Sequence, residues 1–166
     1  ICQALFWKIL RKGKNQLKIA ALFGGQGSQY PGMGKNLREE SAAARQVYEC
    51  AGDILGFDVA KMSEQGSEEE LAQTRIAQPV IFTHSLAAFA AARDVLPLPD
   101  ATAGHSLGEY AALRCAGCFS IEDGFRIIAA RAAVMEEAAD SADGAMVAVI
   151  GSSPEAVEAV CARHHQ

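Results

Sequence analysis

The sequence has no long hydrophobic run and few aromatic residues. Aromatics make up only 7% of its 166 residues, and no uninterrupted apolar stretch approaches the roughly 18 residues of a membrane span. Half of the residues are apolar, which is typical of a globular domain and argues against intrinsic disorder. The composition therefore predicts a soluble domain that does not associate with membranes.

Positive charge is scarce outside the N-terminus. The chain has 15 basic and 20 acidic residues, and residues 1–18 hold five of the bases and no acid. The acidic remainder has no general attraction for nucleic acid or anionic lipid, so neither is expected as a partner. Residues 1–17 are interpreted as a basic tail or linker. Their apolar stretch precedes the bases, the reverse of a secretory signal.

The cysteines do not form the pattern of a disulfide framework or a zinc site. There are five, an odd number, and free thiols in a reducing cytoplasm are the simplest explanation. Cys115 and Cys118 form a CxxC pair, but no second pair follows it. The expected location is therefore cytoplasmic.

Strands and helices are predicted to alternate along the chain. Strands are expected at 18–23, 101–104 and 145–150, and helices at 33–55, from Ser67, at 79–95 with Pro79 in its first turn, from Leu107, at 120–139 and from Ser153. This alternation predicts an α/β fold with a mostly parallel sheet. The sheet is expected to be incomplete, because so little strand sequence accompanies so many helices.

Residues 104–108 (GHSLG) match the G-x-S-x-G nucleophile elbow. The small residues two positions on either side let the backbones pass at a sharp strand-to-helix turn that presents Ser106. The helix N-terminus there favours a developing oxyanion. The alternative is an ordinary glycine-flanked loop with a capping serine.

A glycine-rich loop, 25–29 (GQGSQ), directly follows the first predicted strand. Glycines let backbone N–H groups approach a ligand closely, but the spacing fits neither a P-loop nor a dinucleotide fingerprint. Next to an elbow, this loop could supply a second oxyanion donor. By itself it would be a flexible turn.

Arg131 lies among apolar residues on the helix predicted at 120–139. Ile127, Ile128, Val134 and Met135 fall three or four positions from it, and no acid occupies a helical pairing position. A guanidinium on a buried face needs an anionic partner from elsewhere. That partner is either a ligand or a distant acid in a structural salt bridge.

Several motifs together resemble malonyl-CoA:acyl-carrier-protein transacylase and the acyltransferase domains of polyketide and fatty-acid synthases. They are FGGQGSQ (23–29), AQP (77–79), GHSLGEY (104–110), Arg131 with Met135, and GAM (144–146). The resemblance runs in register from about residue 18 to 163. It implies an acyltransferase that moves malonyl from coenzyme A to the phosphopantetheine thiol of acyl carrier protein, with no metal or bound cofactor.

The resemblance also implies residue roles. Ser106 would be the nucleophile, and the backbone N–H groups of Leu107 and Gln26 would form the oxyanion hole. Arg131 would hold the malonyl carboxylate as a bidentate pair. Gln78 would help shape the site.

In the same resemblance, His105 would flank the nucleophile. The family usually has proline where this chain has Gly24, which is expected to loosen the oxyanion loop. The general-base histidine of the family would lie beyond Gln166, so the 166-residue chain alone is expected to be catalytically crippled.

The resemblance implies an N-terminal portion of a longer enzyme. Residues 18–140 would belong to an α/β-hydrolase-like acyltransferase core, and 141–166 would begin a small ferredoxin-like inserted subdomain that is truncated here. Two alternatives are an α/β-hydrolase-type esterase or thioesterase, and a non-catalytic fragment that docks carrier protein. An ordinary hydrolase would have no obvious use for Arg131, and its HGGG-type oxyanion loop is missing.

Overall fold

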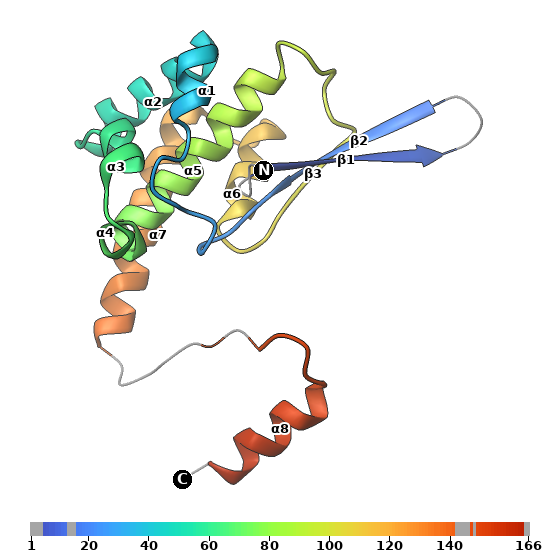
Figure 1. Ribbon diagram of the computed structural model, residues 1–166, viewed down its shortest axis with the longest axis vertical. Helices are drawn as coiled ribbons and strands as arrows, with labels where there is room; N and C mark the ends of the chain where they lie inside the picture. The colour runs from blue at the N-terminus through green and yellow to red at the C-terminus, as the bar shows by residue number, and fades with distance from the viewer. Residues whose placement is uncertain (1–4, 13–15, 142–146, 148, 165–166) are drawn as a thin grey trace.

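The computed structural model describes residues 5–12, 16–141, 147 and 149–164. A three-stranded sheet in the order β1-β2-β3 is formed by β1 (Leu5–Lys12), β2 (Gln16–Phe23) and β3 (Ala101–Gly104) (Figure 1). β1 pairs with β2 antiparallel, whereas β2 pairs with β3 parallel. The carboxyl ends of β2 and β3 therefore lie at the same edge of the sheet.

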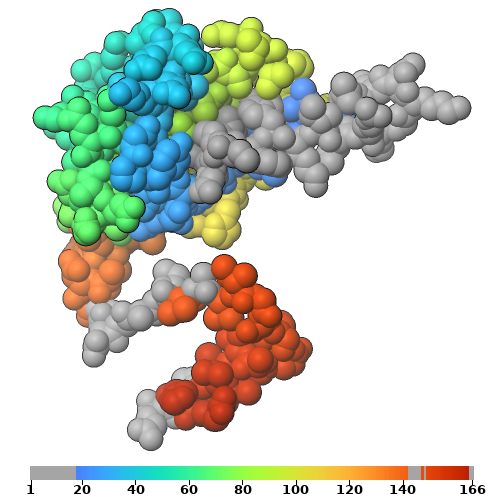
Figure 2. All heavy atoms as spheres, viewed as in Figure 1, coloured from blue at the N-terminus to red at the C-terminus, as the bar shows by residue number. Residues whose placement is uncertain are grey.

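Helices make up most of the fold. They are α1 (Lys35–Glu40), α2 (Ala42–Leu55), α3 (Val59–Gln65), α4 (Glu68–Ala72), α5 (Thr74–Ala92), α6 (Gly108–Cys115), α7 (Ile121–Asp140) and α8 (Pro154–Arg163). Helices α1 to α7 form one body with the sheet at its side, and α8 lies apart from it (Figures 1 and 2). None of these described helices is long and apolar enough to cross a membrane.

Helix α5 is the centre of the core. All residues of the run 77–87 are buried, and the helix packs against α2, α4, α6 and α7. Phe82 meets Phe125 of α7 edge to face at 5.5 Å between ring centroids, and Phe23 of β2 lies 6.2 Å from Phe89. A helix with apolar residues on every face is stable only when other elements surround it, and the few polar side chains of this run are buried as well.

The predicted capping signals are confirmed. Ser67 and Glu70 form a reciprocal capping box at α4, and the Ser120 hydroxyl accepts from the Asp123 N–H at the start of α7. Ser153 caps α8 in the same way. Strand β3 matches its predicted range.

Two helix predictions are wrong in their boundaries. The helix predicted at 33–55 is divided at Ser41, whose extended backbone ends α1 and whose hydroxyl caps α2. Pro79 lies inside α5 rather than in its first turn, and the helix ends at Ala92. Complete burial of residues around Pro79 outweighs its missing N–H donor.

The sheet also differs from the prediction. Residues 5–12 of the segment interpreted as a tail form β1, so the sheet has one antiparallel and one parallel pair. The strand predicted at 145–150 falls largely outside the described residues. Val147, Val149 and Ile150 are described, are not in a strand, and are exposed.

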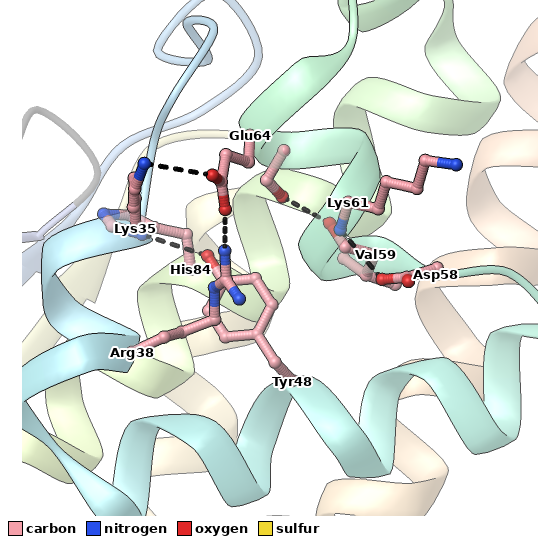
Figure 3. A network of polar contacts seen from close by, with 9 residues as sticks. Lys35, Arg38, Tyr48, Asp58, Val59, Lys61, Glu64 and His84 are labelled. Atoms are coloured by element: carbon pink, nitrogen blue, oxygen red, sulfur yellow. Dashed lines mark hydrogen bonds and ion pairs between the residues drawn. The ribbon is translucent and has the colours of Figure 1, made fainter.

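A partly buried polar network joins the first three helices to α5 (Figure 3). The Tyr48 hydroxyl lies 3.3 Å from Nδ1 of His84, and Glu64 pairs with both Lys35 and Arg38. The Arg38 guanidinium lies over the Tyr48 ring at 5.2 Å. Burial lowers the pKa of His84 to about 4, so the folded protein holds this imidazole in its neutral form.

Acid is therefore expected to destabilise the protein through His84. The unfolded chain takes up a proton near pH 6.5 and the folded chain only near pH 4, so stability falls as pH is lowered across this interval. Between pH 7 and 5 the loss should be on the order of 2 kcal/mol, measured by urea unfolding. His84→Gln should flatten this part of the profile. An unchanged pH dependence in that variant would contradict the assignment.

Candidate active site

Ser106 occupies a strained turn between β3 and α6. Its φ of 52° is the positive value of a non-glycine residue in the left-handed region, and its side chain is exposed. A Cβ on Gly104 would lie 2.0 Å from the Gly108 carbonyl carbon, and one on Gly108 would lie 2.2 Å from the Phe23 carbonyl oxygen. The predicted steric reason for the two glycines is confirmed.

The glycine-rich loop lies beside this turn. The His105 N–H donates to the Phe23 carbonyl at 3.1 Å, and a Cβ on Gly25 would come within 2.7 Å of the His105 carbonyl oxygen. Within the described ranges, no hydrogen bond takes up the backbone N–H of Gln26 or Leu107. Parallel pairing of β2 with β3 thus brings two backbone donors and the serine to one sheet edge.

Arg131 of α7 reaches the serine. Its Nη2 donates to Ser106 Oγ at 3.3 Å, and its guanidinium lies 5.5 Å from the centre of the Tyr110 ring. No acid in the described part of the chain forms an ion pair with it. The apolar stripe around it is only partly covered, since Val134 is 65% exposed. The alternative of a structural salt bridge has no partner among the described residues.

Gln78 of α5 lies buried beneath the glycine-rich loop and α7. Its side chain is fully buried, and its Nε2 lies 3.4 Å from Oε1 of Gln26 and 3.3 Å from the Met135 sulfur. Gln26 Nε2 donates in turn to Thr74 Oγ1 at 3.4 Å. The buried Oε1 of Gln78 has no hydrogen-bond partner among the described residues. Gln78 is thus joined to the glycine-rich loop through Gln26 and to α7 through Met135.

The structure brings together all six residues predicted for the site, although His105 contributes its backbone to the packing and has an exposed side chain. The sequence analysis did not indicate Thr74, and it quoted Tyr110 only as part of the GHSLGEY motif without a role. Thr74 contacts the site through Gln26, and Tyr110 through Arg131. Among the described residues, no cluster of three His, Cys, Asp or Glu side chains could hold a metal ion.

Alanine substitutions at two glycines, one in the elbow and one outside it, are expected to change stability very differently. Gly108→Ala would place a methyl group against the β2 backbone, which cannot move without disrupting the sheet, so about 3 kcal/mol or more of stability should be lost. Gly52→Ala in α2 is the matched control, because its added Cβ meets its nearest neighbour at 3.6 Å and alanine favours helix. Thermal unfolding of both variants tests this. Equal stability of the two would contradict the close packing.

An exposed serine in a left-handed strand-to-helix turn, beside backbone N–H donors and an arginine, is the arrangement of a nucleophile elbow on an α/β fold. The family model described as "Acyl transferase domain" matches residues 21–164, and the chain belongs to this family.

Curated relatives have names that agree with the resemblance. The chain is 42% identical over 143 residues to a malonyl CoA-acyl carrier protein transacylase of Bacillus subtilis, covering 86% of this chain and 45% of the relative. The Haemophilus influenzae protein of the same name is 38% identical over 146 residues, with 87% and 47% covered. The chain thus spans about half the length of the curated relatives it matches.

Solved structures show the same overlap. The MCAT structure from Streptococcus pneumoniae superposes with a TM-score of 0.76 at 38% identity, covering 86% of this chain and 46% of that one. A malonyl-transacylase in complex with a type II PKS acyl-carrier protein superposes with a TM-score of 0.74 at 33% identity, covering 86% and 46%. These likenesses establish an α/β acyltransferase fold.

Proposed function

We propose that this chain carries the nucleophile half of a malonyl-CoA:acyl-carrier-protein transacylase. The observation that supports this most directly is the Arg131 guanidinium, which lacks an acid partner among the described residues and lies 3.3 Å from Ser106 Oγ. A carboxylate two bonds from a reacting thioester carbonyl would bring negative charge to this position. Hydrolysis of an ordinary ester would leave the arginine without a function.

The proposed reaction has two acyl transfers. Ser106 Oγ attacks the thioester carbonyl of malonyl-CoA, the carbon–sulfur bond breaks, and coenzyme A leaves as its thiol. The phosphopantetheine thiol of carrier protein then attacks the seryl ester and releases Ser106. In each step the N–H groups of Leu107 and Gln26 would stabilise the oxyanion, and Arg131 would hold the malonyl carboxylate.

A general base must take the proton of Ser106, because a serine hydroxyl is a weak nucleophile. In the described part of the chain, Ser106 Oγ has a hydrogen bond from Arg131 and none from a histidine. The resemblance assigns this base to a position beyond Gln166. We therefore expect the 166-residue chain to transfer malonyl far more slowly than a protein of full family length that carries it, when both are assayed in parallel.

We also propose that the chain contains parts of two structural units. Residues 18–140 would form part of an α/β-hydrolase-like core, and 141–166 would begin a ferredoxin-like insert. The expected partners are malonyl-CoA and acyl carrier protein, as the names of the relatives and the carrier-protein complex suggest. The expected setting is fatty-acid or polyketide synthesis in the cytoplasm.

Mass spectrometry after mixing the full-length protein with malonyl-CoA tests the function. Malonyl transfer predicts a persistent adduct of one malonyl group on the peptide containing Ser106, which disappears when carrier protein with a free phosphopantetheine thiol is added. Immediate release of free malonate would instead indicate a thioesterase. The absence of both adduct and hydrolysis would favour a non-catalytic docking fragment. Coenzyme A alone is the control.

A further inference from the structure

A cavity lies at the opposite end of α6 from Ser106. It has a volume of about 220 Å³, is partly open to solvent, and is lined by residues of α2, α5, α6, the first turn of α7 and Arg93. Its walls are mainly apolar, and they include Val47, Leu86 and Ile121. α6 spans Gly108–Cys115, about 12 Å at 1.5 Å per residue, so the cavity is separate from Ser106.

Two arginines border this apolar space. Arg93, which is exposed, and Arg114, which is half-buried, both line it, and neither forms an ion pair with an acid in the described part of the chain. The Nε of Arg114 is buried and has no hydrogen-bond partner among the described residues. A buried guanidinium donor without an acceptor is costly, and a carboxylate would satisfy Nε and a neighbouring N–H side by side.

The rest of the lining offers no competing charge. Burial raises the pKa of the Cys115 thiol to about 12, so this side chain stays neutral and behaves as a small apolar group. The aromatic ring of Phe89 completes the wall. The cavity thus combines apolar walls with positive charge, which matches an anion that carries a short hydrocarbon chain.

We propose that this cavity binds a medium-chain monocarboxylate, with the chain among the apolar walls and the carboxylate on Arg114 and Arg93. The volume is that of about seven water molecules, at roughly 30 Å³ each, which suits a chain of about six to eight carbons. The site is independent of the proposed malonyl transfer. It contacts the last turn of α6 and the first turn of α7, the two helices that position Ser106 and Arg131.

Octanoate is the probe, and binding to the full-length protein is measured by isothermal titration calorimetry. Arg114→Gln should weaken octanoate binding about tenfold or more, because a charge-assisted hydrogen bond is lost. Ala90→Trp, which fills the cavity from α5, should abolish binding. Arg126→Gln is the matched control, since it removes a positive charge on α7 outside the cavity and should leave the affinity unchanged.

Two further measurements separate this site from the nucleophile. Octanol, which has the chain without the charge, should bind at least tenfold more weakly than octanoate. Malonyl-CoA should not displace octanoate, and malonylation of Ser106 should still occur with octanoate bound. No octanoate binding, equal affinity in Arg114→Gln, or full affinity in a folded Ala90→Trp variant would overturn the proposal. So would displacement by malonyl-CoA. None of these outcomes depends on the catalytic activity.

Discussion

Replacing Ser106 with alanine in the full-length protein is expected to abolish the malonyl-enzyme and to lower malonyl transfer by roughly four to six orders of magnitude. The reaction would lose its nucleophile, and binding together with oxyanion stabilisation would leave only a residual rate. The measurements are the mass of the peptide containing Ser106 after mixing with malonyl-CoA, and the rate of transfer to carrier protein. Normal transfer by this variant would refute the assignment of Ser106.

A second substitution at the same position separates the loss of the nucleophile from the cost of the strained backbone. Ser106 has a positive φ that costs a non-glycine residue about 1 kcal/mol or more, and alanine would retain this cost. Ser106→Gly should therefore be inactive like Ser106→Ala but more stable than it by about 1 kcal/mol in denaturant unfolding. Equal stability of the two variants would mean that the turn relaxes when the hydroxyl is removed.

The elbow is the feature that the sequence predicted most completely. Its chemistry depends on local sterics: glycines at 104 and 108, a serine between them and a helix immediately after. Such a pattern is readable because Gly104 packs against Gly108 four residues on, although Gly108 itself also packs against the distant Phe23 carbonyl. The same holds for the capping residues Ser67 and Ser120, whose hydroxyls bond N–H groups three positions away.

The failures have a different origin. The division at Ser41 and the placement of Pro79 inside α5 depend on what the surrounding helices bury, and that information is spread over the whole chain. β1 was missed because its pairing with β2 is a contact between strands, and its basic residues suggested a solvated tail. Local propensity therefore indicated the type of element better than its ends or its partners.

The arrangement of the site likewise depends on contacts between residues that are distant in sequence. The resemblance could suggest roles for Gln78 and Arg131, but their contacts join a helix to a loop or turn that is distant in sequence. The bond from Arg131 to Ser106 spans 25 residues, and that from Gln78 to Gln26 spans 52. The sequence left open whether Arg131 pairs with a ligand or with a distant acid. Among the described residues, the structure places no acid in an ion pair with it.

Arg131→Ala is expected to reduce malonyl transfer selectively. If the guanidinium pairs with the malonyl carboxylate, its removal should cost about 2–5 kcal/mol in kcat/KM, the usual range for breaking a buried charge pair. Acetyl transfer should suffer less or improve, because an acetyl group has no carboxylate. The measurement compares the full-length protein and its variant with malonyl-CoA and acetyl-CoA.

A lysine variant and a stability measurement show whether Arg131 binds the malonyl carboxylate or supports the fold. Arg131→Lys keeps the charge but loses the planar pair of donors, so its malonyl transfer should fall between those of the native protein and Arg131→Ala. Since no described acid pairs with Arg131, neither variant should lose more than about 1 kcal/mol of stability. Equal losses for malonyl and acetyl, accompanied by a large loss of stability, would show that Arg131 supports the fold instead. A selective loss at unchanged stability would mean that the arginine is held open for the substrate's carboxylate.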